Sequence, residues 1–157
     1  MARGRVYRAV FQNIAVTAVQ DLISLTATAG MVFCVHEVWV GQITQTTVAN
    51  LNMSLKILPA TVTAGSGGAA VTPSAMLRGD AASTVTSRRN DTTQATTSGT
   101  AIVARADVIN PINGYQYLPP VEDRPVIKLS EAFVVSLDTA PGASMNVSGG
   151  IVFEELF

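Results

Sequence analysis

The sequence predicts an all-β protein: an antiparallel two-sheet sandwich, jelly-roll-like, with about eight strands. Val, Ala, Ile and Leu carry the apolar part of the composition, accompanied by many Thr, and only 6% of the residues are aromatic. Stiff β-branched side chains fit pleated strands better than helices. Several segments also alternate apolar and polar residues with a period of two, the repeat of a half-buried strand. A helical apolar stripe fits only residues 14–25, where Thr and Ser interrupt it.

The length predicts one domain over residues 1–157, because domains commonly contain about 100–200 residues. A chain of this size buries roughly two thirds of the surface that its unfolded form exposes, so it builds a core without a metal or disulfide staple. Residues 1–13 are expected to form an N-terminal strand or arm of this domain.

Seven segments have a strand pattern. In residues 51–57, large apolar side chains alternate strictly with polar ones. Residues 31–40 are apolar on both phases except at His36 and Glu37, a pattern typical of burial on both faces, so we expect a central strand there. The segments are residues 7–12, 21–26, 31–40, 51–57, 100–108, 131–137 and 144–153.

The region 59–98 has a different texture, rich in Gly, Ala, Ser and Thr with a Gly-Ser-Gly-Gly run at its centre. A structureless stretch of this length inside a compact domain is uncommon and is usually functional or disordered. Its scattered apolar residues favour an extended loop or arm within the domain that becomes ordered on a neighbouring surface. A mobile surface loop is the alternative.

A second loop, residues 110–125, is rich in turn-forming residues. Asn113-Gly114 is a strong signal for a tight turn, and a Pro-Pro pair at 119–120 does not fit a central strand. Tyr115 and Tyr117 give this loop amphipathic contact surface. They are either anchors of an interface or half-buried tyrosines that close the end of the sandwich.

The charge content indicates association with other proteins. Only 13% of the residues are charged, about half the usual share, and the net charge is -1. So few charges favour permanent interfaces, although a Thr-rich soluble surface is the alternative reading. The small net charge argues against nucleic acid or an anionic membrane as partner. With neither a signal-peptide pattern nor a long apolar run in the sequence, we expect a cytoplasmic site of synthesis.

The two ends of the sequence carry opposite charges. Arg3, Arg5 and Arg8 lie near the start, and Glu154 and Glu155 lie near the end. Such clusters either pair between subunits or form solvated termini, and the second reading is the more common.

Catalytic chemistry has few candidates in this composition. His36 is the single histidine and Cys34 the single cysteine, which leaves no multi-Cys or multi-His metal site and no cofactor motif. The two residues share a strand face, but their valine-rich surroundings favour a packed, hydrogen-bonded histidine over a catalytic one. The carboxylates show no spacing that singles out a catalytic pair. We therefore expect no enzyme, with no catalytic, cofactor-binding or metal residues.

The order of several segments resembles small virion proteins of tailed bacteriophages and prophages, in particular β-rich capsid decoration (cement) proteins. The segments are an Arg/Tyr-rich opening strand, Phe11-Gln-Asn-Ile-Ala-Val-Thr-Ala-Val-Gln-Asp-Leu22, His36-Glu-Val-Trp-Val-Gly41, Gly65-Ser-Gly-Gly68 followed by Thr72-Pro73, Asn90-Asp-Thr-Thr93, and Ser148-Gly-Gly-Ile-Val-Phe-Glu-Glu155. The resemblance implies a jelly-roll-like fold, homotrimers or homodimers, and binding to the outer capsid lattice. It also implies the major capsid protein or another virion protein as partner, and a place on the capsid surface after assembly in the host cytoplasm.

Residues 1–13 and 59–98 are the expected contact elements, because extended segments can add strands to a partner's sheet edge. The candidate interface residues are Arg3, Arg5, Tyr7, Arg8, Tyr115 and Tyr117. One alternative function is another particle component, such as a head fibre base, a tail or a baseplate protein. A second is a carbohydrate-binding β-sandwich module that uses Trp39, Tyr115 and Tyr117 as stacking platforms.

Overall fold

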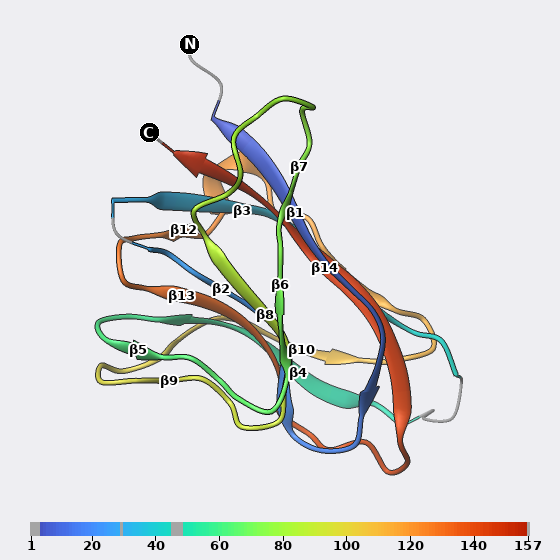
Figure 1. Cartoon of the computed structure of the whole chain (residues 1–157). Helices are drawn as coiled ribbons and strands as arrows, with labels where there is room; N and C mark the ends of the chain where they lie inside the picture. Colours follow the sequence, from blue (N-terminus) through green and yellow to red (C-terminus); the bar gives the residue numbers. More distant parts are fainter. Residues whose placement is uncertain (1–3, 29, 45–48, 157) are drawn as a thin grey trace.

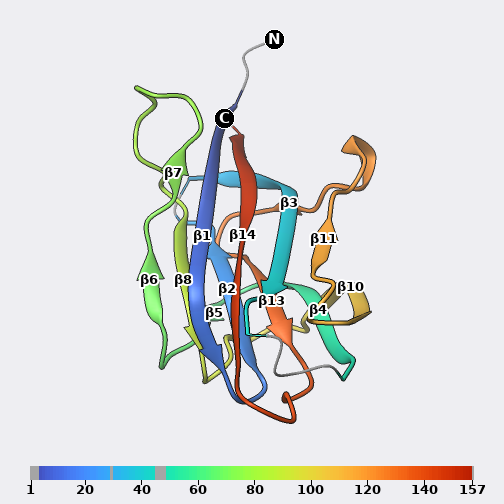
Figure 2. The ribbon, with the colours of Figure 1, turned by 90° about the vertical axis from the view of Figure 1, so that its right-hand side faces the viewer.

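The structure is a computed structural model that describes residues 4–28, 30–44 and 49–156. It confirms the predicted fold class, since two antiparallel sheets pack face to face as a sandwich (Figure 1). β1 (Arg5–Val16) and β14 (Met145–Leu156), the first and last strands, lie side by side in one sheet (Figure 2). This part of the chain contains no helix capable of spanning a membrane.

The described residues form fourteen strands and one short 3-10 helix, η1 (Val121–Asp123). Eight of these strands contain six residues or more, in line with the predicted number. The other strands, in chain order, are β2 (Gln20–Thr26), β3 (Val32–Gln42), β4 (Leu51–Leu58), β5 (Val62–Thr63), β6 (Ala69–Val71), β7 (Ser74–Ala75), β8 (Thr86–Asp91), β9 (Thr96–Thr97), β10 (Ile102–Ile109), β11 (Tyr115–Tyr117), β12 (Val126–Ile127) and β13 (Ala132–Leu137).

The strand order is that of a jelly roll. One sheet runs β11-β3-β14-β1-β7, with β12 also paired to β3, and the other runs β10-β4-β13-β2-β8-β6. Eight strands remain if β5 to β9 are treated as an insertion and β11 and β12 are counted as one strand. Numbered one to eight along the chain, the strands lie in the order one, eight, three, six across the first sheet and two, seven, four, five across the second. This is the arrangement of a jelly roll.

The core lies between the two sheets and follows the period of two. On β1, Tyr7, Ala9 and Phe11 are buried, whereas the residues between them are exposed. The Tyr7 and Phe153 rings stack with centroids 5.7 Å apart, and the Phe33 ring meets Phe153 edge-on at 5.5 Å. Aromatic pairs of this geometry add stability beyond the area they bury, so strands β1, β3 and β14 are fixed to one another at this end.

The structure corrects the expectation of an arm for residues 59–98. β8 and β6 extend the second sheet beyond β2, and a small two-stranded sheet of β5 and β9 packs on the outer face of that sheet. Val62 of β5 and Ala95, the residue before β9, cover Leu58, Ala132 and Val134. Val71 and Val85 of this segment likewise pack against the core of the same chain, whereas Met76 and Leu77 stay exposed.

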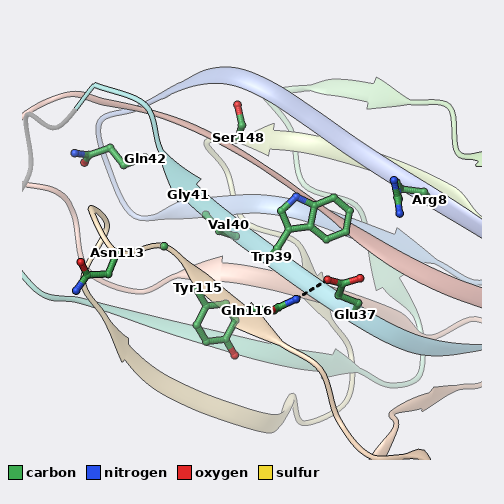
Figure 3. A pocket seen from close by; sticks show the side chains of 11 residues that line it. Arg8, Glu37, Trp39, Val40, Gly41, Gln42, Asn113, Tyr115, Gln116 and Ser148 are labelled. Carbon is green, nitrogen blue, oxygen red and sulfur yellow. Dashed lines mark hydrogen bonds between the residues drawn. The ribbon is translucent and has the colours of Figure 1, made fainter.

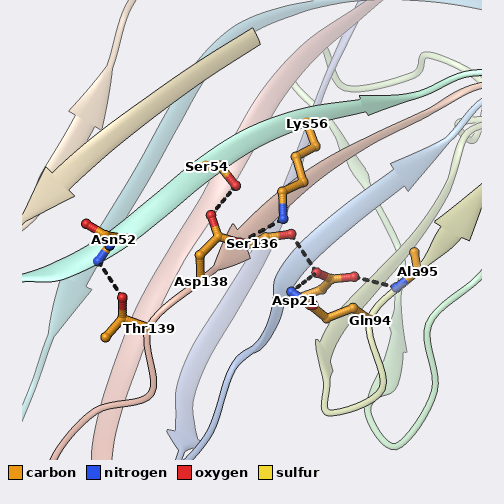
Figure 4. A network of polar contacts seen from close by, with 9 residues as sticks. All are labelled: Asp21, Asn52, Ser54, Lys56, Gln94, Ala95, Ser136, Asp138 and Thr139. Atoms are coloured by element: carbon orange, nitrogen blue, oxygen red, sulfur yellow. Dashed lines mark hydrogen bonds and ion pairs between the residues drawn. The ribbon is translucent and has the colours of Figure 1, made fainter. Parts of the chain in front are cut away.

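A polar network lies beneath this insertion (Figure 4). The Asp21 carboxylate, 1% exposed, accepts hydrogen bonds from the Ser136 hydroxyl at 2.7 Å, the Ala95 backbone N–H at 2.7 Å and the Gln94 amide at 3.3 Å. Burial raises the pKa of Asp21 although these hydrogen bonds act in the opposite direction. The carboxylate thus ties the insertion to the sheet.

Two strands differ from their sequence pattern. β3 is central as predicted, between β14 and the pair β11 and β12, but only one of its faces is buried and the other is half-buried. β10 was expected to bury one apolar face, yet almost all of its side chains are exposed because it is the edge of its sheet and bulges between Val103 and Arg105.

Candidate functional site

The outer face of the first sheet carries the tryptophan of the chain. In register across the sheet, Gln116 of β11 lies opposite Trp39 of β3, which lies opposite Gly150 of β14, which lies opposite Val10 of β1. Their neighbours in the strands point into the core, so these four residues share the solvent face. Trp39 is half-buried there, and Val10 is 49% exposed.

Gly150 makes room for the Trp39 ring. A Cβ atom at position 150 would lie 2.7 Å from Cζ2 and 2.8 Å from Cη2 of the indole, which is closer than real contacts allow. The ring therefore lies against the bare backbone of β14. The Arg8 guanidinium lies 5.5 Å from the ring centroid, a cation–π distance.

A hollow of about 810 Å³ opens beside the ring (Figure 3). Its rim carries a carboxylate, a guanidinium, three carboxamides and a hydroxyl. The Gln116 amide donates a hydrogen bond of 2.8 Å to the Glu37 carboxylate, which holds both planar groups in place. We call this site the Trp39 hollow. The residues lining it are Arg8, Glu37, Trp39, Val40, Gly41, Gln42, Asn113, Gly114, Tyr115, Gln116 and Ser148.

The turn before β11 forms one wall of the hollow. Asn113 donates its backbone N–H to the Asn110 carbonyl at 3.1 Å, and Gly114 has φ of 72°, a left-handed conformation that favours glycine. A Cβ atom at Gly114 would lie 3.3 Å from the Val40 carbonyl oxygen. The predicted Asn113-Gly114 turn is confirmed, and its role is to bring β11 against β3.

A second surface is the outer edge of β10, which we call the β10 edge (Ile102–Ile109). No described strand pairs with this edge, so its backbone N–H and C=O groups there face solvent. Ile102 is 53% exposed, Val103 55% and Val108 67%. A strand of eight residues with one unpaired edge and exposed apolar side chains at both ends is a ready template for pairing with another chain.

The structure separates the predicted interface residues. Tyr7 is corrected to a core residue, since it is fully buried and its hydroxyl donates to the Ala81 carbonyl at 2.9 Å. Arg3 lies outside the described residues. Arg5 is half-buried at the start of β1, and Arg8 is exposed beside Trp39.

Tyr115 and Tyr117 close the side of the sandwich, the second of the two readings of the sequence. They lie opposite Val40 and Val38, on the inner side of β11, and pack against the core. The Tyr115 hydroxyl donates to Asp107 at 2.8 Å, and burial together with this carboxylate raises the pKa of Tyr115 above 10.0. Tyr117 lies under the Arg105 guanidinium at 5.5 Å, away from the Trp39 hollow.

Cys34 and His36 lie on the half-buried outer face of β3. Burial raises the pKa of the Cys34 thiol, which disfavours the thiolate that nucleophilic chemistry requires. His36 Nε2 lies 3.0 Å from Glu154 Oε2. Among residues 4–28, 30–44 and 49–156, no group of three or more His, Cys, Asp or Glu side chains is arranged to hold a metal ion.

Comparison with known proteins assigns the chain to no family. No protein-family model, no curated protein and no solved structure matches it. The sequence analysis identified Trp39 and Arg8 but did not associate them with each other. It did not assign Gln116 or Ser148 to a site and identified Asn113 only as a turn residue, because the pairing of β11 and β14 with β3 is what brings these side chains together.

Proposed function

We propose that this chain is a structural protein of a virus particle, a capsid decoration protein that pairs with a second copy of itself and binds the outer lattice of the shell. The observation that carries the proposal is the β10 edge, a strand of eight residues with a free side and exposed apolar side chains. The sparse charge of the chain favours the same role, since permanent interfaces are depleted of charged residues. Jelly rolls recur in viral capsid proteins, which agrees with the role without establishing it.

The sequence of β10 is self-complementary in the antiparallel sense. Arg105 and Asp107 form an ion pair within each chain. If two copies pair with Ala106 at the centre, Arg105 of each copy also lies opposite Asp107 of the other, so the two ion pairs adjoin with alternating charge. A parallel, in-register pair would place like charges opposite each other. Opposite charges facing across an antiparallel pair contribute roughly 0.2–1 kcal/mol each, and like charges are destabilising. The edge thus favours a twofold dimer with one continuous sheet across both subunits.

The same geometry supports the proposed attachment to a shell. In a dimer, each surface outside the β10 interface is present twice. Two weak contacts to neighbouring lattice subunits then act together, and avidity raises the overall affinity for the shell. The exposed apolar residues away from β10 are candidates for these contacts. They include Met76 at 50% and Leu77 at 66% exposure, in the loop between β7 and β8.

Copy number in purified particles tests the proposal. Particles are purified from the cells that make the chain, and its copies are counted by quantitative mass spectrometry against the major shell protein. A copy number comparable to that of the shell protein is expected. A handful of copies per particle would instead favour the head fibre base, tail or baseplate alternative, and absence from particles would refute a virion role.

A further inference from the structure

We propose that the Trp39 hollow binds a sugar, specifically one neutral pyranose ring of a glycan, with the ring placed against the Trp39 indole. This inference goes beyond a structural role and rests on a different part of the molecule. The hollow lies on the outer face of β3, β14 and β11, whereas the β10 edge belongs to the other sheet.

The apolar part of the site is the indole. A pyranose has a face of C–H groups that packs on an aromatic ring, and tryptophan offers the largest such ring with a polar N–H at its edge. Gly150 leaves the β14 backbone bare beneath the ring, so the indole is supported from below by the sheet, and the exposed Arg8 side chain places its guanidinium over the ring, 5.5 Å from the centroid. A supported ring loses little conformational entropy when a ligand covers it.

The polar part of the site matches the hydroxyl groups at the edge of a sugar. Glu37 supplies acceptors, Arg8 supplies donors, and the Gln116 and Asn113 carboxamides each supply both. The Glu37–Gln116 hydrogen bond fixes two of these planar groups before a ligand arrives (Figure 3). An apolar ligand would leave these groups without partners, so the rim disfavours it.

Charge selects a neutral sugar. Arg8 and Glu37 are the two charged residues that line the hollow, and their formal charges cancel. A sugar acid would gain from Arg8 but would be repelled by Glu37. The hollow is open along the sheet, which fits one ring of a longer chain better than an enclosed small molecule.

Intrinsic fluorescence gives a direct readout, because Trp39 is the single tryptophan of the chain. The purified protein is titrated with lactose, maltose, cellobiose and mannobiose, and with sialyllactose as the acidic probe, at millimolar concentrations. A long neutral polysaccharide in a further arm distinguishes binding of a free sugar from binding of a glycan chain. We expect a saturable change of Trp39 emission with at least one neutral sugar.

Variants then locate the binding site. Isothermal titration calorimetry of Trp39→Ala should show no binding, and Gln116→Ala should weaken binding about tenfold through loss of a hydrogen-bonding group. Gln12→Ala, an exposed glutamine on β1 outside the hollow, should bind as wild type does. Thermal melting confirms that each variant is folded.

Three results would overturn the inference: no neutral sugar changes the emission, binding survives in folded Trp39→Ala, or only the sialylated sugar binds. None of these results bears on dimerisation through β10. Conversely, a monomeric chain that binds a neutral sugar at Trp39 would support this inference and contradict the proposed pairing.

Discussion

Glu155, near the end of the chain and fully buried, accepts a 2.8 Å hydrogen bond from the backbone N–H of Thr84. The same carboxylate oxygen accepts from the Ser83 hydroxyl at 2.7 Å and the Val85 N–H at 3.3 Å. The last strand therefore fixes the end of the loop between β7 and β8. The acidic end of the sequence is not simply a solvated terminus, because one of its two glutamates is an internal anchor.

Replacing this anchor should weaken the fold. Glu155→Ala removes the acceptor of the Thr84 N–H and of the Ser83 hydroxyl and leaves the Val85 N–H with the Ser83 oxygen alone, so we expect a loss of about 2 kcal/mol in the free energy of unfolding. Urea denaturation measures it. Glu122→Ala, at an exposed position in η1, serves as control and should unfold as wild type does. Equal stability of the two variants would show that the Glu155 contacts contribute nothing.

The sequence was sufficient to predict the long strands because their periodicity is set by burial. Residues 51–57 alternate, and Leu51, Met53 and Leu55 are indeed buried in β4. β8 was missed because its residues, Thr86–Asp91, are mostly polar. It forms because β2 offers an edge to pair with, a tertiary fact that no local pattern contains.

Asp21 should make stability depend on pH in an unusual direction. Its pKa lies above 3.8 in the folded protein because of burial, so the folded state binds this proton more tightly than the unfolded state. The contribution of Asp21 to stability therefore increases as the pH falls through the folded pKa toward 3.8. Asp21→Asn lacks the buried charge, so its free energy of unfolding relative to that of the wild type should be highest at neutral pH. This difference in the free energy of unfolding should shrink on acidification, as measured by urea denaturation at several pH values. A pH-independent difference would contradict the raised pKa.

Asp107 should behave in the opposite way. Burial raises its pKa, but hydrogen bonds from Arg105 at 2.5 Å and from Tyr115 outweigh it, so the net pKa is lowered from 3.8. Its stabilising contribution is present above 3.8 and is lost as the pH falls through that value toward the folded pKa. Asp107→Asn should lower the free energy of unfolding by less than about 1 kcal/mol at neutral pH, because the Arg105–Asp107 pair is partly exposed. In strong acid the substitution should leave the free energy of unfolding unchanged. NMR titration of the Asp107 carboxyl carbon measures the pKa directly, and a value at or above 3.8 would contradict the geometry.

The aromatic cluster around Phe153 should lose less stability when Phe153 is replaced by a residue of similar volume than when the replacement leaves a cavity. Phe153→Ala removes the ring that both Tyr7 and Phe33 contact, and we expect a loss of about 4 kcal/mol. Phe153→Leu keeps most of the volume and should lose less than about 2 kcal/mol. Chemical denaturation of the two variants measures the difference. Similar losses would mean that the two rings do not pack around Phe153.

The candidate site was only partly predictable, for a geometric reason. Alternation alone places Tyr115 and Tyr117 on one face of a strand and Gln116 on the other. It does not say which face meets the core. The pairing of β11 with β3 decides this, since Trp39 lies opposite Gln116 and not opposite a tyrosine. The sequence therefore identified Trp39 but wrongly grouped Tyr115 and Tyr117 with it as stacking platforms.

The oligomeric state of the purified chain tests the account most directly. Sedimentation velocity over a range of concentrations should show a dimer for the wild type and a monomer for Val108→Lys, which places a charge on the β10 edge. Leu129→Lys, a similar change at a residue 51% exposed outside β10, should remain a dimer. A wild-type chain that stays monomeric at every concentration, or a Val108→Lys variant that dimerises as the wild type does, would contradict pairing through β10.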